Sequence, residues 1–334
     1  MKFRSTLLRA AATAALSLLL ASCGGESLVA FVPERVLVFG DEASVITLEA
    51  VPSQGKKYTI NALNTDGTFA CGSNQLWIQV LASSYGIGFP ECPGPTSAGA
   101  AATAGRILAK PGATASGTLA IDLAQQITQQ LNKPVADGGG ISANDLVTVY
   151  IGVNDVVEAY KRYEAGATQA EVSALVDASG VAIAAQVARI AAAGGRVIVS
   201  TVPDVGATPY GRSKDVAGTA LLTFLTGRIN SQFLLELQNS GNNNGREIGL
   251  IELNPYLLNV IAFPASYGYV NAVEAACKDL PLPPNCTTLT LRNNPDGTPA
   301  GAFNWLWSNE LQLSPGGHLQ LGSLASTRAR NQPF

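Results

Sequence analysis

The chain has 334 residues, with 21 Lys and Arg against 24 Asp and Glu, which gives a formal net charge of −3. Charged residues make up 13% and apolar residues 47% of the sequence. A chain of this length and composition can bury one large core, and nothing in it separates two halves. The slightly acidic balance disfavours nucleic acid as a partner.

The first 22 residues have the pattern of a secretory signal, because three basic residues precede an apolar run over residues 10–20. The run is too short to span a bilayer permanently. The segment Leu20-Ala21-Ser22-Cys23 resembles the lipobox of bacterial lipoproteins, which implies export and acylation of the Cys23 thiol, with palmitate as a typical acyl chain. An ordinary signal peptide with an unrelated cysteine is the alternative.

Removing residues 1–22 takes away three positive charges and no negative ones, so the net charge moves from −3 to −6. Gly24 and Gly25 follow the cysteine, and no Asp stands where it would favour retention in the inner membrane. We therefore expect an outer-membrane lipoprotein whose membrane contact is the lipid anchor. Residues 23–34 are predicted to form the lipidated tether, and residues 35–334 a single domain.

Four cysteines remain once Cys23 is set aside, and an even number in an exported chain indicates disulfides. Short separations favour the local pairs Cys71 with Cys92 and Cys277 with Cys286, since both would pin irregular segments rich in Pro and Gly. Metal ligation is the competing interpretation. It is weak, because the chain has one histidine and no Cys-x-x-Cys spacing. We expect no metal and no cofactor.

Apolar runs typical of buried parallel strands alternate with helical patterns along the rest of the chain. This alternation predicts an α/β fold, a three-layer α/β/α sandwich with a mainly parallel sheet of about five strands. Residues 48–71 fit no crossover helix, and a hairpin is predicted around residues 64–67 and a polar surface loop at residues 239–244. The predicted strands are residues 35–39, 106–109, 146–151, 196–201 and 248–253, and the predicted helices are residues 74–84, 117–131, 171–193 and 216–237.

Ligands of such sheets bind beyond the carboxyl ends of the strands, so the loops there hold the candidate site. Three of these loops resemble the conserved blocks of the SGNH (GDSL) hydrolase superfamily of lipases, esterases and phospholipases. They are Val36-Leu-Val-Phe-Gly-Asp-Glu-Ala-Ser44, Ala109-Lys-Pro-Gly-Ala-Thr114 and Tyr150-Ile-Gly-Val-Asn-Asp155. Weaker similarity at residues 202–209 and 264–268 extends the resemblance from Arg35 to the C-terminus. The resemblance implies a flavodoxin-like fold and ester hydrolysis.

The same blocks imply roles for particular residues. The nucleophilic serine of the family directly follows Gly-Asp, and Glu42 stands at that position here. The resemblance assigns the oxyanion-hole donors to the amide of Gly112 and to the side chain of Asn154.

The closing block of the family holds the other two triad positions, in an Asp-x-x-His motif. A Pro-containing turn follows, with a glycine five residues after the histidine. Here Gly317 fixes the register, which places Asn309 at the aspartate position and Gln312 at the histidine position. All three triad positions therefore carry residues other than Ser, Asp and His.

His318 is the only histidine of the chain, so a register that makes it the base needs a test. That register would put Pro315 at the aspartate position. Pro315 is also a natural first residue of the closing helix after Ser314 as N-cap. We therefore predict that His318 lies in the first turn of that helix and has a structural role.

The substitutions predict a loss of catalysis, because Gln312 has no usable basicity and Asn309 has no imidazolium to stabilise. Loss of one triad member typically costs on the order of four powers of ten in rate. The Glu42 carboxylate is expected to point at the donors of Gly112 and Asn154 and to fill the hole from within. Gln312 and Asn309 would complete a hydrogen-bond network with it.

Two replacement nucleophiles are conceivable. Ser44 lies two residues beyond the family position, where it would more readily stabilise the first turn after the strand. Glu42 would need a partner acid, and the neighbouring Asp41 and Asp155 are expected to support their own loops.

Three functions follow for testing. The first is a non-catalytic SGNH-type envelope lipoprotein that keeps the oxyanion-hole frame and binds an acyl, ester or glycan ligand or an envelope protein. The second is an ester hydrolase that uses Ser44, Glu42 or His318. The third is a purely structural role without a ligand. Family resemblance alone favours hydrolysis, but function depends on the site.

Overall fold

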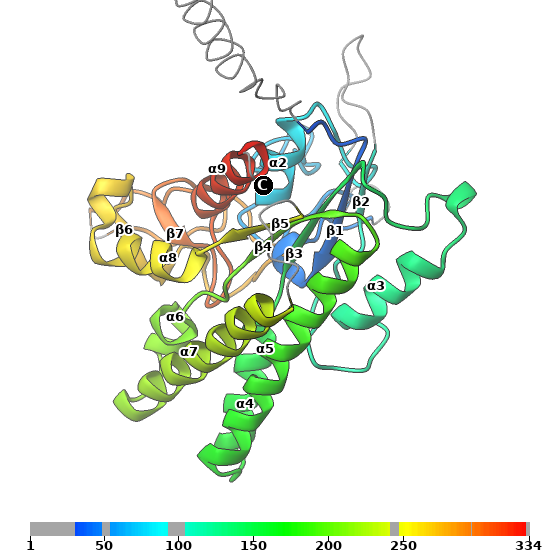
Figure 1. The fold of residues 1–334 in the computed structure, drawn as a ribbon. Helices are drawn as coiled ribbons and strands as arrows, with labels where there is room; N and C mark the ends of the chain where they lie inside the picture. Colours follow the sequence, from blue (N-terminus) through cyan, green and yellow to red (C-terminus); the bar gives the residue numbers. More distant parts are fainter. Residues whose placement is uncertain (1–30, 49–53, 93–103, 241–246, 295, 332–334) are drawn as a thin grey trace, which may run out of the picture. The chain divides into compact units, whose positions relative to one another are not determined.

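Five parallel strands form the central sheet, in the order β2-β1-β3-β4-β5 (Figure 1). The computed structural model describes residues 31–48, 54–92, 104–240, 247–294 and 296–331, so the predicted signal, Cys23 and residues 24–30 of the tether lie outside the described residues. The predicted parallel sheet of five strands is confirmed. Its strands are β1 (Arg35–Gly40), β2 (Gly105–Ile107), β3 (Asp145–Tyr150), β4 (Arg196–Ser200) and β5 (Ile248–Ile251).

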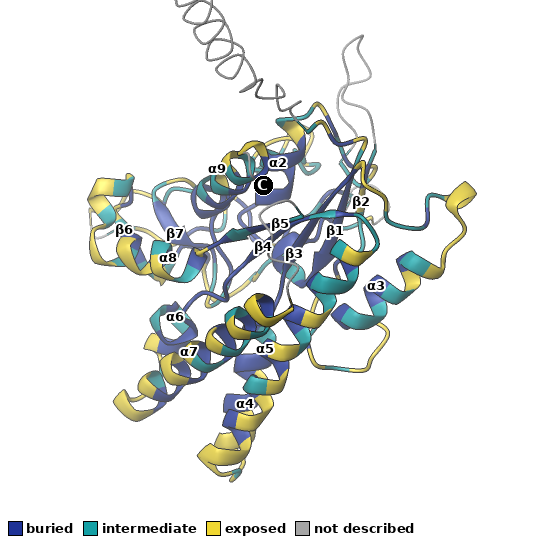
Figure 2. Cartoon of the chain, viewed as in Figure 1, coloured by how far each residue is buried: buried dark blue, intermediate teal, exposed yellow. Residues whose placement is uncertain are grey.

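Strands β1 and β3 lie inside the sheet and are mostly apolar because both of their faces are covered. Val36, Leu37, Val38 and Phe39 of β1 have no solvent exposure, and every residue of β3 is buried. Figure 2 shows β1, β3 and β4 as almost wholly buried, whereas the helices around the sheet have one buried and one exposed side. This is the pattern expected of a middle layer in a three-layer fold.

Helices cover the two faces of the sheet. On one face α2 (Trp77–Ser83) packs against α9 (Pro315–Arg330), and α9 also contacts β4 and β5. On the other face α5 (Gln169–Ala192) packs against α4 (Val153–Glu164) and α7 (Val216–Asn239), with α3 (Leu123–Asn132) beside it (Figure 1). By length and composition α5 could cross a membrane, but its packing is that of a core helix.

Three of the predicted helices keep their positions to within a few residues, and α3 begins later than predicted. Residues 117–122 are not helical, because the Asp122 carboxylate accepts hydrogen bonds from the backbone N–H of Thr114 and Leu119 at 2.8 and 2.7 Å. These contacts hold the segment as a loop that ends in α3. Competition from such side-chain contacts is a common reason for a late helix start.

Several elements of the structure were not predicted. They are α4, α8 (Leu253–Ala262), the short α6 (Pro209–Arg212), four one-turn 3-10 helices, η1 (Glu42–Ser44), η2 (Val135–Asp137), η3 (Val205–Ala207) and η4 (Pro264–Tyr267), and a small parallel pair of strands, β6 (Asn271–Ala275) and β7 (Trp305–Trp307). The predicted hairpin reduces to a bridge between Leu63 and Phe69 around a tight turn.

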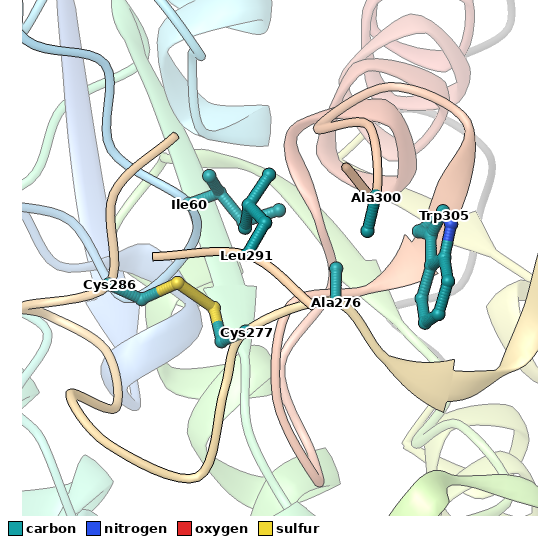
Figure 3. Packing of buried hydrophobic residues seen from close by; sticks show 7 residues of the cluster. All are labelled: Ile60, Ala276, Cys277, Cys286, Leu291, Ala300 and Trp305. Carbon is teal, nitrogen blue, oxygen red and sulfur yellow. A yellow bond between two sulfur atoms is a disulfide. The ribbon is translucent and has the colours of Figure 1, made fainter. Parts of the chain in front are cut away.

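A second, smaller core lies under the long loops beside β6 and β7. Figure 3 shows its members, which come from the 54–63 segment and from residues 276–305: Ile60, Ala276, Cys277, Cys286, Leu291, Ala300 and Trp305. The disulfide Cys277–Cys286 is part of this cluster, and a second disulfide joins Cys71 to Cys92. The structure thus confirms both predicted pairs, and each one pins a segment without regular secondary structure.

Candidate functional site

Three neighbouring strands end at one edge of the sheet, and the loops that follow them carry the candidate site. Glu42 follows β1, Gly112 follows β2 after a short loop, and Asn154 opens α4 directly after β3. Because parallel strands place their carboxyl ends at the same edge, residues that are far apart in sequence meet there. Gln312 joins them from the loop before α9.

The centre of the site is the carboxylate of Glu42. Its Oε2 accepts hydrogen bonds from the backbone N–H of Gly112 and from Nδ2 of Asn154, both at 3.0 Å. Its Oε1 accepts a hydrogen bond from Nε2 of Gln312, also at 3.0 Å. The structure therefore brings four of the predicted site residues into one network of charge-assisted hydrogen bonds.

The backbone at Gly112 is shaped for this contact. Its φ of +76° lies in the left-handed region, which favours glycine, and a Cβ added there would meet open space. The strain of that conformation, rather than crowding, is thus what selects glycine. The conformation aims the Gly112 N–H at Glu42.

Asn154 is held in one orientation by a second contact. Its Nδ2 also donates to the carbonyl oxygen of Ala113 at 3.0 Å. The next residue, Asp155, is buried, and its carboxylate accepts hydrogen bonds from the backbone N–H of Ala115 at 2.9 Å and of Ser116 at 3.4 Å. The first turn of α4 therefore ties down the loop that carries Gly112.

Gln126 provides a further support that the sequence did not reveal. Its Oε1 accepts from the N–H of Gly40 at 2.9 Å and its Nε2 donates to the Gly40 carbonyl at 2.8 Å. Gly40 has a φ of +132°, and an added Cβ would lie 1.9 Å from the carbonyl oxygen of Tyr150. Gln126 thus fixes the end of β1 just before Glu42. A polar residue at a helix position facing the sheet was the only available signal.

Asn309 does not join the network as predicted. Its Oδ1 accepts hydrogen bonds from the backbone N–H of Leu311 at 3.0 Å and of Gln312 at 2.6 Å. Among the described residues no hydrogen bond joins Asn309 to Glu42. The oxygen of the short Asn309 side chain accepts hydrogen bonds within its own turn and so positions the backbone of Gln312. The Gln312 side chain, rather than Asn309, contacts the Glu42 carboxylate.

Ser44 is fully buried in η1, and its Oγ accepts the indole N–H of Trp77 at 3.1 Å. Among the described residues no hydrogen bond links Ser44 to Glu42, Asn154 or His318. Ser44 therefore fixes α2 against the end of β1, and Trp77 is a supporting residue that the sequence gave no reason to select.

His318 lies in the first turn of α9, where Ser314 is the N-cap and Pro315 the first helical residue, as predicted. The imidazole has no solvent exposure, and its Nδ1 accepts the backbone N–H of Trp77 at a long 3.5 Å. Its Nε2 has no hydrogen-bond partner within the described part of the chain. Burial, together with the nearby Lys57, lowers the pKa of His318 to about 3.

The acidic residues beside Glu42 serve their own loops. Asp41 accepts the N–H of Ala43 at 3.0 Å and caps η1. Burial, with Glu42 and then Asp155 adding repulsion, raises the pKa of Asp41 well above its usual range. Burial also raises the pKa of Asp155. Neither carboxyl is placed to act as the partner acid of a Glu42 nucleophile.

The arrangement can hold an anion but offers no reactive hydroxyl beside its donors. Gly112, Asn154 and Gln312 present three N–H groups to one carboxylate, and no serine, threonine or histidine hydrogen-bonds to that carboxylate among the described residues. In the same residues no group of three His, Cys, Asp or Glu side chains could hold a metal ion.

The comparison with protein families agrees with the loop motifs. The family described as GDSL-like Lipase/Acylhydrolase matches residues 38–298, a span that includes Glu42, Gly112 and Asn154 and ends before Asn309 and Gln312. A search of curated proteins finds no match.

Among solved structures, the chain is similar to an acetylxylan esterase from Geobacillus stearothermophilus, with 12% identity, coverage of 91% of this chain and 97% of that chain, and a TM-score of 0.44. It is also similar to an extracellular lipase from Streptomyces rimosus, with 15% identity, coverage of 89% and 99%, and a TM-score of 0.43.

Proposed function

The chain belongs to the GDSL-like lipase/acylhydrolase family, and we propose that it is a non-catalytic member in which Glu42 permanently occupies the family's anion-binding frame. The observation that carries the proposal is the triple contact of the Glu42 carboxylate with Gly112, Asn154 and Gln312. Two of these donors are the ones that the family resemblance assigns to the oxyanion hole.

The chemistry of the residues supports this proposal. Acyl transfer in a Ser-His-Asp site needs a hydroxyl nucleophile, a base that removes its proton and a carboxylate that orients the base. Glu42 offers no hydroxyl, the Gln312 amide takes no proton near neutral pH, and Asn309 is engaged with its own turn. An ester carbonyl would also have to displace a charged group to reach the donors of the hole.

The alternative is an ester hydrolase with an unusual nucleophile or base, and the contacts of its candidates disfavour it. Ser44 is buried under the Trp77 indole, and His318 is buried between α2 and α9. A hydrolase that used either residue would have to expose it first. Neither Asp41 nor Asp155 serves Glu42 as a partner acid, since both bind backbone N–H groups.

The decisive test is turnover of short-chain aryl esters by the purified protein. We expect no hydrolysis above the buffer rate, and no change with Ser44→Ala or Glu42→Ala. The positive arm is the triple variant Glu42→Ser, Asn309→Asp and Gln312→His, which restores the family residues around the donors of Gly112 and Asn154. It should exceed the wild type by at least about tenfold. Wild-type turnover that Ser44→Ala or Glu42→Ala abolishes would overturn the proposal.

A binding measurement tests the occupied frame separately from catalysis. Glu42→Ala leaves three N–H donors without their acceptor, which should lower the free energy of unfolding by about 2–4 kcal/mol. Added formate or acetate should bind in the vacated space and raise the thermal midpoint of this variant but not of the wild type. Glu158→Ala, which removes an exposed carboxylate from α4, is the matched control. It should unfold with nearly the wild-type free energy, and formate or acetate should not raise its thermal midpoint. Equal effects of formate on all three proteins would contradict an occupied frame.

We further propose that this protein is an outer-membrane lipoprotein anchored through Cys23 and that it binds an acyl, ester or glycan ligand or an envelope protein. The support is the sequence of the first 25 residues and the even set of the other cysteines. Labelling of expressing bacteria with an alkyne analogue of palmitate should mark the protein, and Cys23→Ala should abolish the label. Retention of the label in that variant would place the modification elsewhere.

A further inference from the structure

Three segments of the chain that lie next to each other are free of charged residues. Residues 253–273, 297–309 and 311–327 contain no Asp, Glu, Lys or Arg, and the single histidine among them is fully buried. They form α8, η4 and most of β6, the loop into β7, and the first three turns of α9. In Figure 1 these elements gather on one side of the domain, away from α3.

Hydrogen bonds join the three segments into one surface. The N–H of Val270 donates to the carbonyl of Asn304 at 2.8 Å, and that of Gly316 to Ala302 at 3.1 Å. Nε2 of Gln320 donates to the carbonyl of Tyr267 at 3.2 Å. The apolar residues next to these contacts therefore lie on neighbouring parts of the surface.

Besides Leu258 on α8, which is 40% exposed, four large apolar side chains of this surface face solvent. Phe263 is 64% exposed, Val270 65%, Phe303 54% and Leu319 47%. Single exposed apolar residues are common, but several on a surface without charges indicate an interaction site. We call the surface formed by these four residues the uncharged face. Along the chain, charged residues flank the three segments at Glu252, Glu274, Asp296, Glu310 and Arg328.

We propose that the uncharged face inserts into the surface of a lipid bilayer. A charged group moved toward hydrocarbon costs several kcal/mol, so a surface that enters lipid must lack charges. Tyr256 and Tyr267 stand edge to face at this surface, and tyrosine is enriched at the level of lipid headgroups. The proposal rests on neither Cys23 nor the state of Glu42.

Hydrogen exchange of the full chain with and without phosphatidylcholine vesicles tests the face directly, because exchange in each segment is measured separately from that of residues 1–30. Vesicles should slow exchange in residues 263–270 and 300–304 by roughly tenfold. Because the face is uncharged, the protection should need no anionic lipid and should persist in 1 M salt. Unchanged exchange in both segments would overturn the proposal.

Variants separate the face from the rest of the chain. Phe263→Asp with Phe303→Asp should remove the protection and lower the vesicle partition coefficient of the Cys23→Ser chain by about tenfold per phenylalanine. The matched control is Val216→Asp, because Val216 is 89% exposed at the start of α7 beside charged residues. It should change partition by less than about twofold. Equal partition of the double variant and the wild type would refute membrane insertion. Protection that grows with protein concentration without vesicles would instead assign the face to a second copy of the chain.

Discussion

The state of His318 separates a buried structural histidine from a hidden catalytic base. Because the imidazole is fully buried and lies near Lys57, its pKa falls from 6.5 to about 3. Between pH 6.5 and about 3, the His318 imidazole binds a proton in the unfolded chain but not in the folded chain. As the pH is lowered from 6.5 to about 3, the free energy of unfolding should therefore decrease by about 1.4 kcal/mol per pH unit, or about 5 kcal/mol in all.

His318→Asn removes this dependence while keeping an oxygen that can accept the N–H of Trp77. At pH 7 the variant should be less stable than the wild type by about 1–3 kcal/mol, because a smaller side chain leaves a gap. The difference should shrink, and can change sign, as the pH falls from 6.5 toward 4. The titrating carboxyl groups are the same in both proteins, so their contributions cancel in this difference.

Two assays give the answer. Urea denaturation of both proteins between pH 4 and 8 yields the two stability curves. Since His318 is the only histidine, the imidazole signal in a proton NMR spectrum of the folded protein needs no assignment and should not titrate above pH 4. A midpoint between pH 6 and 7 that moves in Glu42→Gln would refute the reasoning, because it would place His318 in contact with the site.

Two further predictions concern buried charges that shape the site and its surroundings. Asp155→Ala should lower the free energy of unfolding by about 2–4 kcal/mol, measured by urea denaturation, because the N–H groups of Ala115 and Ser116 lose their acceptor; Ser116→Ala should cost much less, and equal costs would contradict this assignment. Lys57 is buried with Nζ on the carbonyls of Cys71 and Ser73, and burial lowers its pKa to about 7. Since the unfolded chain keeps that proton until about pH 10.5, wild-type stability should rise by about 1.4 kcal/mol per unit between pH 7 and 9.5 relative to Lys57→Met; parallel curves would show that Lys57 does not titrate there.

The exposed apolar residues of the uncharged face lie apart from Glu42 and its donors, so lipid contact is a second proposed property of this member of the family. In the two proposals together, the protein keeps the fold of an ester hydrolase, fills its anion site with its own carboxylate and contacts lipid through a separate surface. The two tests are independent, since one measures ester turnover and anion binding and the other measures vesicle contact.

Much of the fold could be predicted from the sequence, because buried parallel strands are continuous apolar runs and their order along the chain is visible. The runs around Val36–Phe39 and Leu146–Tyr150 identified the neighbouring strands β1 and β3 to within a residue. The closing helix could be placed at Pro315 because Ser314 and Pro315 carry local start signals. Glycines in the loops marked where the backbone turns toward the site.

Other features depended on contacts that no local pattern encodes. The sequence around Asn309 is compatible with a contact to Glu42 and with hydrogen bonds inside its own turn. The path of the loop before α9 selects the hydrogen bonds inside the turn. Gln126 looks like any polar helix residue until the sheet brings Gly40 beside it. The fate of Ser44 and His318 likewise followed from the position of Trp77 between them.

The sequence by itself determined which residues stand at the family positions, since Glu42, Asn309 and Gln312 are read from motif and register. The family register also predicted that Glu42 meets Gly112, Asn154 and Gln312, whereas only the tertiary structure decided that Asn309 serves its own turn. A carboxylate after β1 becomes an internal ligand because the strand ends of β1, β2 and β3 converge and the loop before α9 folds over them. Such convergence joins residues more than 250 positions apart in the chain, as between Glu42 and Gln312. Local sequence patterns carry no information on contacts of that range.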